Sequence, residues 1–161
     1  MLHEINMIHH ISLPAQNPPH VAQVLAELFN GYFAPFHSNA DSYVALAADE
    51  YGTLIEVYPL GTEMLPGKDN EPIQYQRNEN FSPFIATHAA ISVPKTQEEI
   101  ENIANREGWR VLRCNRGGFF DVIEFWVENN ILLELATPEL AQQYQAALAP
   151  DKLAELFAAQ N

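Results

Sequence analysis

A histidine and a glutamate recur at one spacing in both halves of this chain, and this repeat constrains the fold more than any other feature. His10 and Glu56 are 46 positions apart (56 − 10), and His88 and Glu134 are also 46 apart (134 − 88), so one shift of 78 superposes the two pairs. The neighbours correspond as well: His10-Ile11-Ser12-Leu13 falls on His88-Ala89-Ala90-Ile91, and Leu54-Ile55-Glu56-Val57 falls on Leu132-Leu133-Glu134-Leu135. The sequence therefore predicts two copies of one structural unit.

The first copy is predicted over residues 5–60. Alternating residues indicate a strand over 5–15, and Asn17-Pro18 provides an N-cap residue followed by proline at the first helical position. One apolar stripe then continues the helix to Gly31, which is expected to end it: Val21, Val24, Leu25, Leu28 and Phe29. Turn-rich segments separate three further strands, over about 32–37, 42–48 and 53–59. The order is βαβββ.

The second copy is predicted over residues 84–137, in the same order. A strand over about 85–93 precedes a capping box that runs from Thr96 to Glu99, and Gly108 is expected to have the role of Gly31. Strands follow over about 109–114, 119–127 and 131–136, with a turn at Asn115-Arg116-Gly117-Gly118. We therefore predict an α+β protein built from two βαβββ modules.

Two segments lie outside the modules. Residues 61–83 are polar and contain prolines and glycines, which predicts a linker or lid. Residues 138–161 are predicted to be a helical tail with apolar side chains that must cover either the sheet or a partner subunit: Leu140, Tyr144, Leu148, Leu153, Leu156 and Phe157. Exposed sheet edges and this tail together predict a homodimer.

The charge balance and the single cysteine exclude several classes of function. Eight basic residues against 21 acidic ones give a formal net charge of −13, which disfavours nucleic acid and anionic membrane surfaces as partners. Cys114 is the sole cysteine, so no disulfide forms within the chain, and no segment approaches the ~18 consecutive apolar residues of a membrane span. We expect a cytoplasmic protein that binds a small molecule.

The repeated residues have the chemistry of a metal site. Alternate side chains of a strand share a face, so His10 and Ser12 lie opposite Ile11 and Leu13, on the face that no helix is expected to cover. A carboxylate within a row of apolar neighbours, as at Glu56 and Glu134, is costly unless it is paired or bound to a metal. Two neutral imidazoles and two carboxylates would neutralise one divalent cation, so the predicted metal ligands are His10, Glu56, His88 and Glu134.

Each ligand candidate also has a structural alternative. A lone histidine or glutamate in a strand is more often a packed or solvated residue, and only the common shift favours a site. His9 is the natural competitor of His10, but the shift pairs it with Thr87, so we expect His9 to face outward. A site built within one chain and a site shared across a dimer remain open.

The same alternation selects further residues for a substrate cavity. Ile123, Phe125 and Val127 form one side of their strand, which leaves Glu124 and Trp126 on the side of the glutamate ligand. Glu124 is a candidate general base or support for the metal ligands, and its alternative is a cross-strand partner for an arginine. Arg113 and Arg116 are candidates for binding a substrate anion, with a surface role as the alternative. Trp126 would line the cavity or pack in the core.

On these motifs, residues 5–137 resemble the vicinal oxygen chelate superfamily, which includes glyoxalase I, methylmalonyl-CoA epimerase, fosfomycin-resistance transferases and extradiol dioxygenases. The resemblance implies that the two modules form a cupped, incomplete barrel with metal ligands on the first and last strand of each. Carried over, those positions are His10, Glu56, His88 and Glu134, a set most similar to that of bacterial glyoxalase I. The chain departs from the family at the turn before the last strand, where Glu128-Asn129-Asn130 replaces Asp-Pro-Asp-Gly.

The resemblance implies a metal-dependent isomerase or lyase of glyoxalase type. One divalent metal (Ni, Zn, Co, Mn or Fe) would hold two neighbouring oxygens of the substrate and stabilise an enediolate, while Glu134 or Glu56 acts as the catalytic carboxylate that moves the proton. One alternative is a non-catalytic binding protein similar to the bleomycin-resistance branch. The other is an iron-dependent extradiol dioxygenase, which the fourth ligand disfavours.

Overall fold

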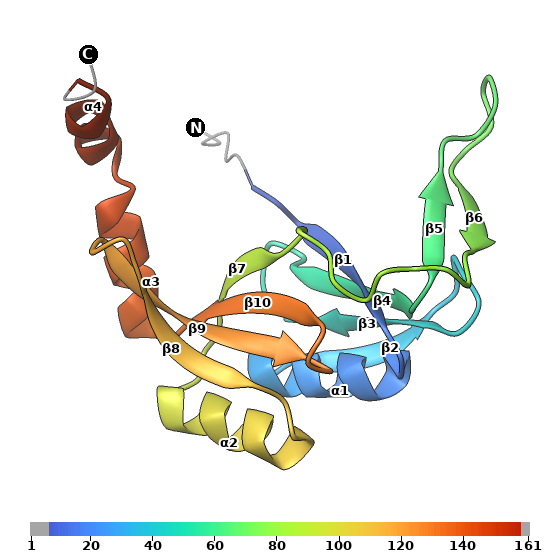
Figure 1. The fold of residues 1–161 in the computed structure, drawn as a ribbon, viewed down its shortest axis with the longest axis horizontal. Helices are drawn as coiled ribbons and strands as arrows, with labels where there is room; N and C mark the ends of the chain where they lie inside the picture. Colours follow the sequence, from blue (N-terminus) through green and yellow to red (C-terminus); the bar gives the residue numbers. More distant parts are fainter. Residues whose placement is uncertain (1–6, 159–161) are drawn as a thin grey trace. The chain divides into compact units, whose positions relative to one another are not determined.

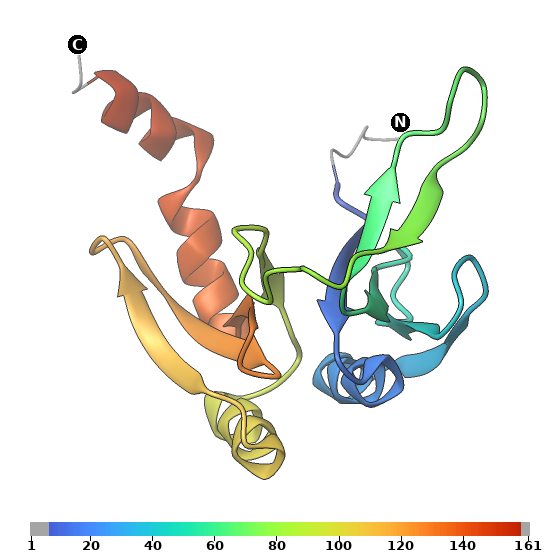
Figure 2. The same ribbon diagram turned by 45° about the vertical axis from the view of Figure 1, so that its right-hand side comes forward.

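The computed structural model describes residues 7–158, with the side chains of residues 155–158 outside the described part. The chain divides between Ile85 and Ala86 into two compact units, each with its own sheet (Figures 1 and 2). No helix within the described residues is long and apolar enough to cross a membrane.

The first unit contains the predicted βαβββ module. Its elements are β1 (His10–Ala15), α1 (Pro18–Phe29), β2 (Tyr32–Phe36), β3 (Ser42–Leu46) and β4 (Leu54–Pro59). The strands form one sheet in the order β1-β4-β3-β2, in which β1 and β4 are parallel and the other pairs are antiparallel. The apolar stripe of α1 packs on one face of this sheet and buries Leu13, Ile55 and Val57. The face with His10 and Glu56 is therefore the one that α1 does not cover.

The second unit repeats the arrangement. Its elements are β7 (Ala89–Ser92), α2 (Gln97–Glu107), β8 (Val111–Arg116), β9 (Phe120–Val127) and β10 (Ile131–Ala136), with the sheet order β7-β10-β9-β8. The predicted capping box at the start of α2 is present, with Thr96 and Glu99 each binding the other's backbone N–H. Ile100, Ile103 and Ala104 of α2 are buried, as are Ile123, Phe125 and Val127 of β9. The predicted α+β class with two βαβββ modules is confirmed.

The strand register confirms the shift of 78. Ser12 pairs with Glu56 between β1 and β4, and Ala90 pairs with Glu134 between β7 and β10, so both strands differ by 78 (90 − 12 and 134 − 56). One prediction within the repeat is wrong. Gly108 ends α2 with a left-handed φ of 70°, and its counterpart is Asn30, which ends α1 at φ 56°, rather than Gly31. A side chain at Gly31 would instead strike the Leu46 carbonyl, 1.9 Å from the added Cβ.

The two modules differ in the hairpin after the helix. Phe36 pairs with Ser42 across the end of the first hairpin, six positions apart (42 − 36), whereas the corresponding Cys114 and Val122 are eight apart (122 − 114). The two extra residues prolong the second ladder until Arg116 pairs with Phe120. The turn predicted at 115–118 is therefore wrong in its first half, because Asn115 and Arg116 belong to β8 and the tight turn uses Gly117 and Gly118 at positive φ.

A hairpin and a helix come after the last strands of the two modules. Residues 61–83, expected as a linker or lid, contain β5 (Thr62–Leu65) paired with β6 (Gln74–Arg77), and the Tyr75 ring stacks on Tyr58 of β4. After β10 come α3 (Pro138–Ala147) and α4 (Pro150–Ala158). Leu140 is buried and Tyr144 contacts Phe120 of β9, so α3 covers its own sheet. The side chains of Leu156 and Phe157 lie outside the described residues.

Candidate functional site

Each unit carries one histidine and one glutamate candidate on the face of the sheet that its βαβββ helix leaves uncovered. We call His10, Glu56, Ser12 and Tyr58 the first half-site. In this half-site His10 Nε2 lies 3.7 Å from Glu56 Oε1, which is too long for a hydrogen bond but close enough for both atoms to bind one ion. His10 is exposed, whereas the Glu56 side chain is 14% exposed.

Glu56 is held by two neutral hydroxyl groups. Ser12 Oγ donates to Glu56 Oε2 at 2.7 Å, and the Tyr58 hydroxyl donates to the same oxygen at 3.0 Å. The pKa of Tyr58 is raised well above its usual range, first by burial and then by hydrogen bonds with Tyr75 and Glu56. Tyr58 therefore remains a neutral donor, and both bonds leave Glu56 Oε1 on the side of His10.

Glu134 is held by a guanidinium instead. We call His88, Glu134, Arg116 and Glu124 the second half-site. Arg116 donates to Glu134 Oε1 through Nε at 2.8 Å and through Nη2 at 2.5 Å, and Nη2 also donates to Glu124 Oε1 at 2.9 Å. One cation thus bridges two carboxylates that lie directly opposite each other on β9 and β10.

The environment of Glu124 supports its ionised form. The hydrogen bond from Arg116 lowers the pKa of Glu124, and the Trp126 indole adds a donor to Oε2 at 3.2 Å. The hydrogen bonds to Glu124 and Glu134 in turn raise the pKa of Arg116. The structure therefore brings together four predicted residues, Arg116, Glu124, Trp126 and Glu134, as a connected polar group.

His88 immediately precedes β7, and its ring is oriented by the backbone. His88 Nδ1 lies 2.9 Å from the carbonyl oxygen of Ala86, which can only accept, so Nδ1 donates this hydrogen bond and the lone pair of the neutral imidazole is on Nε2. Within the described residues, no hydrogen bond or ion pair joins His88 to Glu134. His9, the competitor of His10, is exposed and pairs with the Tyr51 carbonyl at 2.8 Å.

The two half-sites fit a divalent cation by the chemistry of their donors. In each, the described hydrogen bonds to the ligand candidate fall on a single carboxylate oxygen: Oε2 of Glu56 and Oε1 of Glu134. The second oxygen of each carboxylate is left for another partner, and a backbone carbonyl fixes the His88 tautomer, as in many metal-ligating histidines. Within the described residues, no three His, Cys, Asp or Glu side chains form one metal-sized group.

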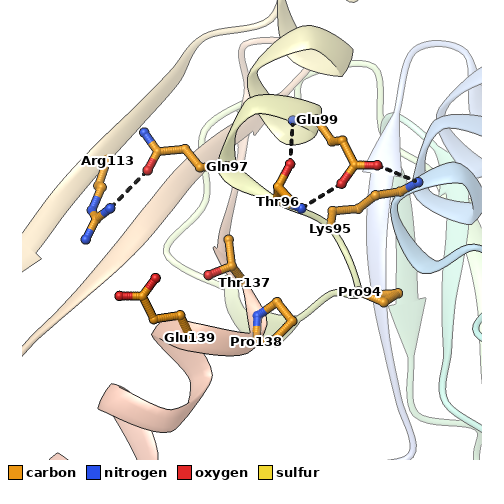
Figure 3. A pocket seen from close by; sticks show the side chains of 9 residues that line it. All are labelled: Pro94, Lys95, Thr96, Gln97, Glu99, Arg113, Thr137, Pro138 and Glu139. Carbon is orange, nitrogen blue, oxygen red and sulfur yellow. Dashed lines mark hydrogen bonds and ion pairs between the residues drawn. The ribbon is translucent and has the colours of Figure 1, made fainter.

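Arg113 lies away from this group. It pairs with Ile123 in the ladder, so its side chain is on the α2 face, where it contacts Asp121 and Gln97. It lines a cavity of about 460 Å³ at the N-terminal ends of α2 and α3, together with Lys95, Thr96, Glu99 and Glu139 (Figure 3). None of the four metal-ligand candidates lines that cavity. The structure therefore separates Arg113 from Arg116, which the sequence grouped together.

Ser12, Tyr58 and Tyr75 were not predicted to support the first glutamate. Ser12 had a usable signal, because it lies two residues after His10 and therefore on the same face of the strand. Tyr58 likewise lies two residues after Glu56. Tyr75 had no such signal, since it comes from a hairpin outside the repeat.

Solved structures share this architecture. A single-residue variant of the FosX fosfomycin resistance protein from Listeria monocytogenes, complexed with Mn(II) and 1S,2S-dihydroxypropylphosphonic acid, matches with a TM-score of 0.55 and 19% identity over 88% of this chain and 98% of that chain. The FosX protein from Mesorhizobium loti matches with a TM-score of 0.50 and 12% identity over 86% and 97% of the two chains. A glyoxylase/bleomycin resistance protein/dioxygenase domain from Frankia sp. EAN1pec matches with a TM-score of 0.50 and 13% identity over 82% and 97%.

The chain has the fold of the vicinal oxygen chelate superfamily. No family model matches the sequence, and no curated protein matches it. The vicinal oxygen chelate fold therefore rests on the two βαβββ modules and on the structural matches, while the activity has to be argued from the half-sites.

Proposed function

We propose that this protein is a divalent-metal-dependent enzyme that acts on a small oxygenated molecule, as an isomerase or lyase of glyoxalase type. The residues proposed to hold the metal are His10, Glu56, His88 and Glu134. The proposal rests on one observation about Glu56 and Glu134. Each carboxylate is held by hydrogen bonds to one of its oxygens, which leaves its other oxygen for a metal ion. Such anchoring is typical of the groups that orient metal ligands.

The proposed chemistry divides between the metal and the chain's own residues. When bound, a divalent cation supplies Lewis-acid stabilisation of negative charge on substrate oxygens. Glu56 or Glu134 accepts a proton from a substrate carbon and returns it to a neighbouring carbon. Ser12 and Tyr58 keep Glu56 in place during this transfer.

Mn(II) is the first metal to test, because FosX structures of the same fold carry it. Protein purified without chelators or a metal-binding tag is expected to bind one divalent ion for each set of the four proposed ligands. Alanine at each of the four proposed ligands should lower the metal content at least about tenfold, whereas His9→Ala should leave it unchanged. Wild-type protein that binds none of Mn, Fe, Co, Ni or Zn, or a His9→Ala variant that loses the metal while His10→Ala retains it, contradicts the proposed site.

The reaction type requires a separate measurement. Metal-loaded protein is incubated in D₂O with α-hydroxy and α-keto carbonyl compounds, and deuterium in the recovered C–H bonds is measured by NMR. Glyoxalase-type proton transfer predicts incorporation that is lost in Glu56→Gln or Glu134→Gln. Oxygen consumption with a catechol would instead indicate the dioxygenase, and full ligand affinity in metal-free protein without turnover would indicate a binding protein.

We also propose that the protein is a cytoplasmic homodimer. Leu140 is buried against its own sheet and is not available to a partner, so the contact must use other surfaces, such as the exposed Tyr32 and Phe33 of the edge strand β2. Light scattering on the full chain measures the molar mass. A mass equal to that of a single chain contradicts the dimer.

A further inference from the structure

The Arg116 guanidinium touches a proposed metal ligand and a second carboxylate at the same time. We propose that Arg116 neutralises Glu134 in the metal-free protein and is transferred to Glu124 when a divalent cation binds. Arg116 is then an exchangeable counter-ion of the site, and Glu124 is the residue that receives it. This inference rests on the proposed metal site and deepens it by describing how the site is kept ready without metal.

A counter-ion is needed because β9 and β10 place two negative charges together. Glu124 and Glu134 are directly opposite each other in an antiparallel ladder, where like charges destabilise the pair. Their side chains are only 17% and 14% exposed, so water screens the repulsion incompletely. The bridging guanidinium places one positive charge between the two carboxylates and offsets their repulsion.

The contacts of Arg116 show how it can leave Glu134 without losing every partner. Nε donates only to Glu134, whereas Nη2 is shared between Glu134 and Glu124. Glu124 is itself held in place by the Trp126 indole. A cation on Glu134 repels the guanidinium and competes for the same carboxylate, so the ion pair with Glu124 is the one that persists. The Arg116 side chain is 32% exposed.

The first half-site has no equivalent of this arrangement. The shift of 78 places Ser38 at the position of Arg116. The residue opposite Glu56 is the buried Val44, whereas the residue opposite Glu134 is Glu124. Glu56 has hydroxyl donors that need not move for an ion to reach Oε1. The transfer is therefore confined to the second half-site.

The experiment follows the Arg116 Nε–H resonance during a Mg²⁺ or Zn²⁺ titration of the full chain by ¹⁵N NMR, with assignment from its absence in Arg116→Lys. On metal binding this resonance should lose its hydrogen-bonded shift and exchange faster with water, while the Trp126 indole resonance also moves. Isothermal titration should show metal binding about tenfold tighter in Arg116→Gln, because the competing cation is gone. Arg116→Lys keeps the positive charge but loses the forked contacts with the two carboxylates. If these contacts compete with the metal, the metal affinity of Arg116→Lys should also rise; if the charge alone matters, it should equal that of wild type.

The outcomes separate this inference from the proposed function. Failure of wild-type protein to bind any divalent metal overturns both. Metal binding with an unchanged Arg116 Nε–H resonance, or with affinity in Arg116→Lys equal to that of wild type, overturns the transfer and leaves the metal site standing. Should Arg116→Gln not fold, the resonance and the Arg116→Lys affinity still decide. Arg110→Gln is the matched control, since Arg110 is exposed just before the same strand, and it should leave the affinity unchanged.

Discussion

The two βαβββ modules are alike through their last strands and differ in the element that follows the last strand and in the groups that hold the glutamate. After β4 comes the β5–β6 hairpin, which stacks Tyr75 on Tyr58, and after β10 comes α3, which buries Leu140 and packs Tyr144 on Phe120. In the first unit the described hydrogen bonds to Glu56 come from neutral hydroxyl groups, whereas in the second unit the Arg116 guanidinium bridges Glu134 and Glu124. A repeated fold can thus keep a ligand position and change its electrostatic support.

The largest expected effect on stability concerns the elements that follow the last strand of each module. Leu140→Ala should lower the free energy of unfolding by about 3 kcal/mol, because it leaves a cavity between α3 and the second sheet. Tyr75→Ala should cost less, about 1–2 kcal/mol, since its ring is only partly buried on Tyr58. Urea unfolding of each variant measures both values, with the exposed Leu148→Ala as a control within about 0.5 kcal/mol of wild type. Equal losses at Leu140 and Leu148 would show that α3 does not seal its sheet.

The next prediction tests the Arg116 guanidinium of the second half-site in metal-free protein. Arg116→Gln should lower the free energy of unfolding by about 1–2 kcal/mol, because Glu124 and Glu134 then repel each other without compensation. Adding Glu124→Gln should recover most of the loss. The control Arg77→Gln removes an exposed pair with Glu79 and should change little. If the double variant is no more stable than Arg116→Gln, repulsion is not what Arg116 offsets.

The unfolding free energies of wild type and Arg116→Gln should depend differently on pH. Arg116 lowers the pKa of Glu124, so the stability that this carboxylate contributes is present above its ordinary pKa of about 4.3 and is lost as the pH falls through the lower folded value. The difference in unfolding free energy between wild type and Arg116→Gln should therefore narrow as the pH falls below about 4.5. A constant difference between pH 7 and pH 3 would contradict this origin.

The smallest effect belongs to the first half-site and has the opposite pH dependence. Tyr58→Phe should cost about 1 kcal/mol at pH 7, because the hydroxyl bonds to Glu56 and Tyr75 are lost. The pKa of Tyr58 is raised in the folded protein, so its contribution is complete below the ordinary phenol pKa of about 10 and decreases as the pH rises above it. Chemical unfolding at pH 7 and pH 11 should show the two proteins converging. If Tyr58→Phe has the stability of wild type at both pH values, the Tyr58 hydroxyl does not stabilise Glu56.

Local sequence was sufficient wherever one segment determines its own structure. The repeat of His10 and Glu56 in His88 and Glu134 predicted two equivalent βαβββ modules, and the capping box at Thr96 predicted the start of α2. The hairpin in residues 61–83 was not predicted, because its polar strands lack a buried face and so show no hydrophobic alternation. Arg116 was assigned to a turn because Gly117 and Gly118 indicate that the chain bends there. They do not indicate the residue at which the pairing between β8 and β9 ends.

The sequence by itself determined that this chain contains one βαβββ unit twice, which face of each strand carries the histidine and the glutamate, and which four residues are candidate metal ligands. These features arise from periodicity and spacing, which are properties of the chain alone. Only the tertiary structure decided that Arg116 bridges Glu134 and Glu124, that Ser12 and Tyr58 support Glu56, and that Arg113 lies on the other face. Those contacts depend on the hairpin length and on which side chains meet across neighbouring strands, and the spacing of residues along one strand does not specify either.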